Sequence, residues 1–200
     1  AHAIDKQAIV DALYPGDAET ASQFLPPMLW GYNQDIEDYP YDPALAQEYL
    51  QKAIDEGVEI PDPIIFYVMP VSRSYYPQPQ PTGELIQAFL ADIGLNAEIQ
   101  SPAWPSPYID DVNRDGRKHD IHMLGWTGDN GDPDNFLCTF FCGAATGWNN
   151  DGEGNPLPPD DEIAQLLRDA VAETDFETRK AMYEEANQLL HDRVIGVPVV

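Results

Sequence analysis

The spacing of apolar side chains along the chain predicts a series of amphipathic helices. Apolar residues recur every three or four positions, the spacing of one helical face, in segments bounded by caps, glycines and prolines. Asp42 and Pro43 have the form of a helix start, and Gly57 ends the apolar stripe that follows. Thr174 and Glu177 have the spacing of a capping box before the last stripe. The predicted helices span residues 5–13, 43–56, 85–93, 133–142, 163–171 and 174–194.

Shorter runs between these stripes predict strands. Residues 64–69 and 121–126 are largely apolar, and residues 95–100 alternate between apolar and polar side chains. Strands that alternate with helices indicate an α/β architecture. No Gly- or Ser-rich linker divides the chain into halves, so the pattern predicts one α/β lobe. We expect functional residues where the strands end, in the loop at 70–81 and the turn at 125–136.

The charge of the chain limits its partners. Its 200 residues contain 10 Lys and Arg against 35 Asp and Glu, which gives a formal net charge of -25 and an isoelectric point near 4.1. Nucleic acids and anionic membranes bind basic surfaces, so neither is an expected partner. A hydrophobic fraction of 43% predicts a folded core, and no apolar run approaches the roughly 20 residues of a membrane helix. Because the chain starts at Ala1 without a signal peptide and ends on an apolar stretch, we expect a piece of a longer protein.

An arginine follows the first predicted strand in a chain that has few basic residues. Arg73 lies within residues 72–79, beside Tyr75 and Tyr76. A guanidinium group presents a planar fork of donors that binds a carboxylate through two hydrogen bonds, and aromatic faces hold such a group or stack on a ligand. The pattern therefore indicates a site for a ligand carboxylate. The alternative is a surface ion pair with one of the many acids.

The turn at residues 125–136, after the last predicted strand, contains three aspartates. Asp132 precedes Pro133 and has the position of a helix N-cap, and negative charge at a helix start also accounts for Asp134. Helix capping leaves Asp129 unexplained. This residue stands early in the turn, near Trp126, where its carboxylate can pair with a cationic ligand group whose apolar part packs on the indole.

The aspartates of this turn and a pair of histidines also allow enzymatic and metal-binding alternatives. Close carboxylates also allow an acid/base hydrolase that uses Asp129 and Asp132, but no His, Cys or Ser near the turn has the setting of a nucleophile. His119 and His122 are three residues apart on a predicted strand. We therefore expect their side chains to point to opposite faces and not to share a metal.

Two further patterns are less specific. Residues 149–160 faintly imitate the ligand spacing of a calcium loop, but the first and last ligands differ and prolines interrupt it, so a solvated loop is expected. Cys138 and Cys142 are four residues apart in a predicted helix. Packed thiols suit that position, because a disulfide at this spacing strains a regular helix, while fraying before Gly143 permits one. No cofactor and no metal site is expected.

Several motifs, in order along almost the whole chain, resemble those of one family. Residues 3–9 are similar to its AIDR/K-x-x-I helix, residues 73–79 to its R-x-Y-x-P-x-P loop, residues 125–136 to its GW-x-x-D-x-x-DPD-x-F turn, and residues 174–186 to its T-D-x-x-x-R-x-x-x-Y-x-E-A helix. This family is the extracytoplasmic solute-binding proteins of peptide ABC transporters, which bind dipeptides and oligopeptides.

The resemblance implies a fold and a site. The fold is one lobe of a type II periplasmic-binding-protein fold, with a mixed sheet flanked by helices. Residues 1–200 would form a single ligand-binding lobe, the C-terminal one, of a larger two-lobed protein, incomplete at both ends. The resemblance implies that Asp129 pairs with the α-ammonium group of a peptide and that Arg73 receives its carboxylate. Trp126 and Tyr75 would line the pocket.

The resemblance also implies a function outside the cytoplasm. The protein would capture di- or oligopeptides and deliver them to the permease of an ABC transporter, and it would not be an enzyme. Its place would be the periplasm or the outer face of the cytoplasmic membrane, with membrane contact only through the permease or through a lipid anchor outside this chain. An oligosaccharide or a nickel chelate is the alternative ligand of the same fold.

Overall fold

A small parallel sheet organises the part of the chain that carries the predicted site. The computed structural model describes residues 1–114, 118–142 and 161–200. Its strands are β1 (Ile64–Tyr67), β2 (Ala97–Gln100) and β3 (Ile121–His122), in the order β2-β1-β3. β1 pairs in parallel with both neighbours, so that Phe66 lies opposite Ile99 on one side and Ile121 on the other. The carboxyl ends of all three strands therefore lie at one edge of the sheet.

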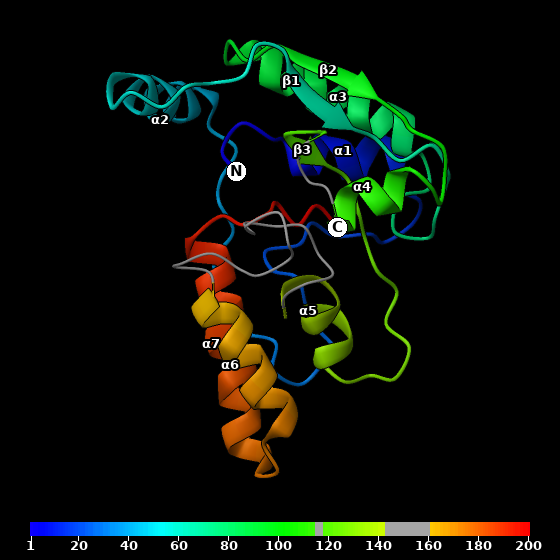
Figure 1. The fold of residues 1–200 in the computed structure, drawn as a ribbon, viewed down its shortest axis with the longest axis vertical. Coiled ribbons are helices and arrows are strands. Elements are labelled where there is room, and N and C mark those ends of the chain that lie inside the picture. The colour runs from blue at the N-terminus through cyan, green and yellow to red at the C-terminus, as the bar shows by residue number, and fades with distance from the viewer. Residues whose placement is uncertain (115–117, 143–160) are drawn as a thin grey trace.

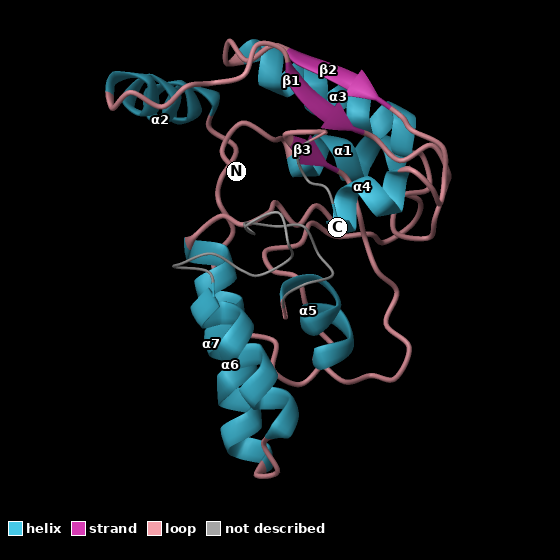
Figure 2. Ribbon diagram, in the orientation of Figure 1, coloured by secondary structure: helices cyan, strands magenta, loops and turns pink. Residues whose placement is uncertain are grey.

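The helices form two groups (Figures 1 and 2). α1, α3 and α4 lie around the sheet, whereas α5, α6 and α7 form a helical group at the other end of the molecule, and α2 stands to one side of the sheet. The bounds are α1 (Lys6–Leu13), α2 (Pro43–Asp55), α3 (Pro79–Asp92), α4 (Tyr108–Arg114), α5 (Asp134–Phe141), α6 (Asp161–Ala172) and α7 (Phe176–Asp192).

Each group has its own apolar core. Burying an apolar side chain of average size contributes roughly 1.5–3 kcal/mol, so each cluster is a large favourable term in folding. The core of the sheet group consists of Ile64, Phe66, Tyr67, Val68, Met69, Ala97, Tyr108, Val112 and Met123. The core of the helical group consists of Leu25, Leu137, Phe141, Ile163, Leu167, Ala170, Tyr183, Ala186 and Leu190. The segment after α7 returns to the sheet group, where Val199 packs with Ile4 and Ile9 of the α1 region.

The periodicity correctly predicts the α/β class and most of the elements, with shifts at their ends. α3 begins at Pro79, earlier than expected, because prolines are tolerated in the first helical turn. The cap of α7 is Asp175, whose carboxylate accepts from the amide of Thr178, so the predicted Thr174 capping box is wrong. The described strands are all parallel, where a mixed sheet was expected.

The third strand is much shorter than residues 121–126. Only Ile121 and His122 belong to it. Just beyond them, the amide of Met123 donates to the carbonyl oxygen of Tyr67, in the neighbouring strand β1, at 2.9 Å. The Tyr108 hydroxyl then lies 2.5 Å from the Met123 carbonyl oxygen and 3.1 Å from that of Tyr67. Residues 124–126 therefore lie outside the strand.

The two histidines near β3 contradict the expectation of opposite faces. His119 Nε2 and His122 Nδ1 lie 3.0 Å apart, within hydrogen-bonding distance. The prediction is wrong because His119 precedes the two-residue strand, and the alternation of a strand does not extend to it. Within residues 1–114, 118–142 and 161–200, however, no three His, Cys, Asp or Glu side chains come together as a metal site would require.

The histidine pair gives a pH-dependent prediction. Although the residue is exposed overall, the atoms around its imidazole desolvate the ring, and this, followed by the neighbouring His119, lowers the pKa of His122 from 6.5 to about 4. Between these values the unfolded chain binds a proton that the folded chain does not, so this group does not change the free energy of unfolding above about pH 6.5 and lowers it as the pH drops towards 4. An NMR titration of the His122 ring should show a midpoint near 4. A midpoint close to 6.5 would contradict this assignment.

The remaining sequence patterns have separate outcomes. Cys138 and Cys142 form a disulfide, with a Cα–Cα distance of 4.5 Å. α5 ends at Phe141, so the bond joins the last helical turn to the residue just beyond it rather than two turns of a regular helix. The calcium-like pattern at residues 149–160 lies outside the described residues. No described helix combines the length and hydrophobicity that a membrane span requires.

Candidate functional site

Two loops that carry predicted site residues meet at the carboxyl edge of the sheet. One follows β1 and contains Tyr75, and the other follows β3 and contains Gly125 and Trp126. A Cβ atom added at Gly125 would lie only 2.4 Å from Cδ2 of Tyr75, so the ring packs directly on the glycine backbone. The Tyr14 hydroxyl donates to the carbonyl oxygen of Tyr75 at 2.8 Å and fixes this loop from α1's end. The structure thus brings Tyr75 beside the segment that contains Trp126.

Arg73 lies in a tight reversal of the loop after β1. Its amide and carbonyl pair with the carbonyl and amide of Tyr76, at 3.0 and 3.1 Å. The side chain is exposed, with its guanidinium carbon 5.0 Å from the ring centre of Trp104 and Nη1 3.3 Å from the carbonyl oxygen of Ser72. In the described part of the chain it pairs with no carboxylate, so the surface ion pair that was the alternative is not seen there.

The tyrosines beside Arg73 stay protonated at neutral pH. Burial raises the pKa of Tyr76 to about 12. Burial also raises the pKa of Tyr75, and this effect exceeds the opposite effect of the Arg73 charge. Both phenols therefore stay neutral, and neither neutralises the charge of the arginine.

The turn that holds Asp129 is organised by Asn135, a residue that the sequence analysis did not single out. Asn135 Oδ1 accepts hydrogen bonds from Nε1 of Trp126 at 3.1 Å and from the amide of Asp129 at 2.7 Å. Trp126 is 39% exposed, so part of the indole remains accessible. The Asp129 carboxylate is exposed and makes no hydrogen bond or ion pair with the described residues. In the sequence, this role of Asn135 is marked only by an asparagine side chain six positions after Asp129.

Asp132 has a structural partner from the other end of the chain. Nη1 and Nη2 of Arg179 bind its two carboxylate oxygens, each at 2.9 Å, and Nε of Arg179 donates to the carbonyl oxygen of Ala170 at 2.8 Å. The guanidinium also lies over Trp30, 5.0 Å from the ring centre. Arg179 therefore ties the start of α5 to α6 and α7 and holds the turn against the helical group.

These contacts decide the protonation of the two later aspartates. Burial opposes ionisation of Asp132, but bonds from Asp134 and Arg179 hold its pKa below the usual range. Burial, and then the neighbouring Asp132, raise the pKa of Asp134. The amide of Asp134 donates to Asp132 Oδ1 at 3.1 Å, so part of the predicted capping role is present, although Pro133 occupies the cap position itself.

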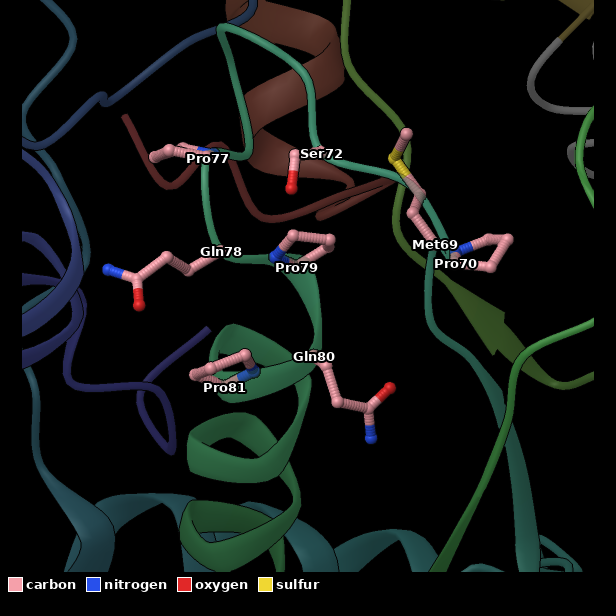
Figure 3. Close-up of a pocket in the computed structure, with 8 residues that line it drawn as sticks. All are labelled: Met69, Pro70, Ser72, Pro77, Gln78, Pro79, Gln80 and Pro81. Carbon is pink, nitrogen blue, oxygen red and sulfur yellow. The ribbon is translucent and has the colours of Figure 1, made fainter.

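A hollow of about 300 Å³ lies beside the loop of Arg73 (Figure 3). It opens between the end of β1 and the first turn of α3, and none of its lining residues is charged. Ser72, the neighbour of Arg73, stands on its rim, and Gln80 is held by a 3.4 Å hydrogen bond from Ser101. The lining consists of Met69, Pro70, Ser72, Pro77, Gln78, Pro79, Gln80 and Pro81. Four prolines make this wall rigid.

The site as a whole presents one cation and one anion that do not neutralise each other. Arg73 follows β1, whereas Asp129 lies seven residues after β3, where its amide is bonded to Asn135 in the first turn of α5. No hydrogen bond or ion pair joins the two side chains in the structure as described. The ring of Tyr75 packs on Gly125, the residue before Trp126. A guanidinium and a carboxylate that are both unpaired can bind a molecule that carries an anionic and a cationic group, with an uncharged body between them.

Known proteins resemble this chain over most of its length. The model of the middle region of bacterial extracellular solute-binding proteins, family 5, matches residues 1–148. The chain belongs to this family. Among its relatives, di/tripeptide-binding protein 1 of Pseudomonas aeruginosa (strain UCBPP-PA14) is 40% identical over 199 residues, which cover 98% of this chain and 35% of the relative. The dipeptide-binding protein of Escherichia coli (strain K12) is 38% identical over 193 residues, 96% of this chain and 34% of the relative.

Solved structures share the fold of this family member. The dipeptide-binding protein of Pseudoalteromonas sp. SM9913, in complex with Met-Leu, matches with a TM-score of 0.80 at 31% identity, over 98% of this chain and 37% of that structure. These relatives are solute-binding proteins, and the α/β lobe expected from the sequence is confirmed. The chain spans about a third of the length of the curated relatives that it matches.

Proposed function

We propose that the complete protein is the substrate-binding component of an ABC transporter, which captures di- or oligopeptides outside the cytoplasmic membrane and delivers them to the permease. In this proposal, residues 1–200 form one of two lobes, and the second lobe closes over the ligand. The observation that carries the proposal is two charged side chains in the segments after β1 and β3, Arg73 and Asp129, neither of which has an ionic partner among the described residues. Family relatives that bind dipeptides and tripeptides support it.

The chemistry of a free peptide matches this edge. A zwitterionic peptide has an α-ammonium group that Asp129 can bind and a carboxylate that the fork of Arg73 can receive. In this proposal Trp126 and Tyr75 would line the space between these groups, and the uncharged hollow beside Ser72 would hold a ligand side chain. Closure of the second lobe would exclude bulk water and strengthen both ion pairs. Water retained around the side chains would allow ligands of different sequence.

The alternatives find less support in the contacts. An acid/base hydrolase would need Asp132 free to exchange protons, but both oxygens of that carboxylate are bound to Arg179. For a nickel chelate, the described ranges of the protein contain no cluster of three side chains that could ligate the metal. An oligosaccharide would use the aromatic faces of Tyr75 and Trp126 but would leave the two charges without partners. We therefore assign no enzymatic activity to the protein.

The place of action follows from the same proposal. The family consists of extracellular solute-binding proteins, so we place the protein in the periplasm or on the outer face of the cytoplasmic membrane. Membrane contact would come only through the permease or through a lipid anchor outside this chain.

Substitution of the arginine tests the carboxylate assignment. In the complete protein, Arg73→Met should lower affinity for a dipeptide such as Ala-Phe by roughly ten- to a hundredfold, since one or two hydrogen bonds between charged groups are lost. Affinity for Ala-Phe amide, which lacks the carboxylate, should stay unchanged. Calorimetric titration measures both, and chromatography of the recovered ligand should show it intact. Equal loss for both ligands, or cleavage of the dipeptide, would speak against the proposal.

A further inference from the structure

Trp104 lies at the sheet edge beside the candidate site, in the loop between β2 and α4. β2 is the other neighbour of β1, and the strands are parallel, so this loop emerges on the same side as the loop of Arg73. The Arg73 guanidinium carbon lies 5.0 Å from the centre of the Trp104 ring. Thirty-one positions separate the two residues in the sequence, and the pairing of the strands brings them together.

Trp104 itself rests on a fixed support. Its ring centre lies 5.6 Å from that of Tyr108, which is completely buried at the start of α4. The Tyr108 hydroxyl lies within hydrogen-bonding distance of the carbonyl oxygens of Tyr67, in β1, and Met123, just after β3. Tyr108, on which Trp104 packs, is thus bonded to the backbone at the ends of β1 and β3, and the candidate site residues follow these two strands.

This arrangement has a consequence for the geometry of Arg73. An exposed arginine has many rotamers, and ordering it on ligand binding weakens affinity. A guanidinium that lies over an indole face is held by the cation–π attraction, while its N–H bonds point outward in their own plane. Of the donors, Nη1 contacts the Ser72 carbonyl, and no carboxylate occupies the rest of the fork in the described residues. The stacked position therefore orders the arginine without using up its capacity to bind a carboxylate.

We propose that Trp104 is a positioning residue of the peptide site, which holds the Arg73 guanidinium ready for the ligand carboxylate and does not itself bind the carboxylate. This inference rests on the proposed function, because it gives Arg73 the role of carboxylate receptor. It adds a residue from a third loop to the site, and it accounts for an arginine that lies on an aromatic face although the chain has 35 acidic residues.

The test compares a dipeptide with its amide in the complete protein. Trp104→Leu should lower calorimetric affinity for Ala-Phe by about three- to tenfold, the worth of a cation–π contact at a partly exposed site, and should leave affinity for Ala-Phe amide unchanged. Trp104→Phe, which keeps a smaller aromatic face and the packing on Tyr108, should lie between Leu and the native protein. A loss that is equal for the two ligands in either variant, or no loss at all, would overturn the positioning role.

A matched control is available in the same chain. Trp30 lies under Arg179 at the same 5.0 Å, but that arginine is already paired with Asp132. Trp30→Leu should therefore change affinity for the dipeptide and for its amide by the same factor. Arg73→Met distinguishes a failure of the Trp104 role from a failure of the proposed Arg73 role. If it removes the preference for the free carboxylate and Trp104→Leu does not, only the role of Trp104 fails; if it leaves the preference intact, the proposed role of Arg73 fails as well.

Discussion

Replacing Asp129 with alanine is expected to abolish tight peptide binding by the complete protein without unfolding it. The carboxylate is exposed on this lobe and contributes no hydrogen bond or ion pair to the described fold, so its loss should not affect stability. In the closed protein it would face the ligand's ammonium group away from bulk water. Removing one partner of such a buried pair typically costs about 3–5 kcal/mol, which is a loss of roughly a hundred- to a thousandfold or more in affinity.

Calorimetry with Ala-Phe measures this loss, and circular dichroism on heating checks the fold. Asp110→Ala is the matched control, because Asp110 is also exposed, accepts a hydrogen bond from the Ser106 hydroxyl as its one side-chain partner among the described residues, and carries the same charge. It should leave affinity unchanged. Asp129→Asn should behave as Asp129→Ala does, since the amide keeps the shape and loses the charge. Unchanged affinity in Asp129→Ala would contradict the ammonium assignment.

Replacing Arg179 with methionine should destabilise the protein and weaken the site together. Arg179 and Asp132 are mostly buried, with exposed fractions of 20% and 27%, and their pair has two hydrogen bonds in parallel. The substitution leaves the Asp132 carboxylate without its cation and frees the carbonyl of Ala170. We expect a loss of about 2–4 kcal/mol in the free energy of unfolding, between the values for exposed and fully buried pairs.

Urea denaturation of the complete protein gives that free energy. Lys180→Met is the matched control, because Lys180 is the next residue of α7 and its bond to Glu184 is a single-point, partly exposed pair one helical turn long, with exposed fractions of 38% and 31%. Such pairs contribute roughly 0.3–0.5 kcal/mol. Arg179→Lys should recover only part of the loss, since an ammonium group cannot bind both oxygens in parallel and reach Ala170. If Arg179→Met and Lys180→Met unfold at the same urea concentration, Arg179 is not the anchor of the turn.

The sequence predicted the elements better than the contacts between them. Helix α2 follows from Asp42, Pro43 and a stripe of apolar residues, all of which act within a few positions of each other. The placement of Arg73 and Asp129 in loops after strands also follows from local pattern. That both loops share an edge depends on β1 and β3 being parallel neighbours, which no local pattern contains.

The residues that the sequence analysis missed act over long separations. Arg179 binds Asp132 across 47 positions, and Trp104 meets Arg73 only because β2 lies beside β1. Local reasoning explained Asp132 by helix capping, which is part of its role, and could not show the arginine that dominates it. The local pattern also gave a wrong prediction for His119, because the alternation of side chains in a strand does not reach beyond the two residues of β3.

The most direct test of the central claim is to identify what the complete protein carries when it is purified. Native mass spectrometry of the protein, followed by denaturation and sequencing of the released ligand, should show intact peptides with a free amino terminus and a free carboxyl terminus. Added Ala-Phe should displace them and be recovered uncleaved. A bound oligosaccharide or metal chelate, or peptides with blocked termini in equal proportion, would contradict a site built on Arg73 and Asp129.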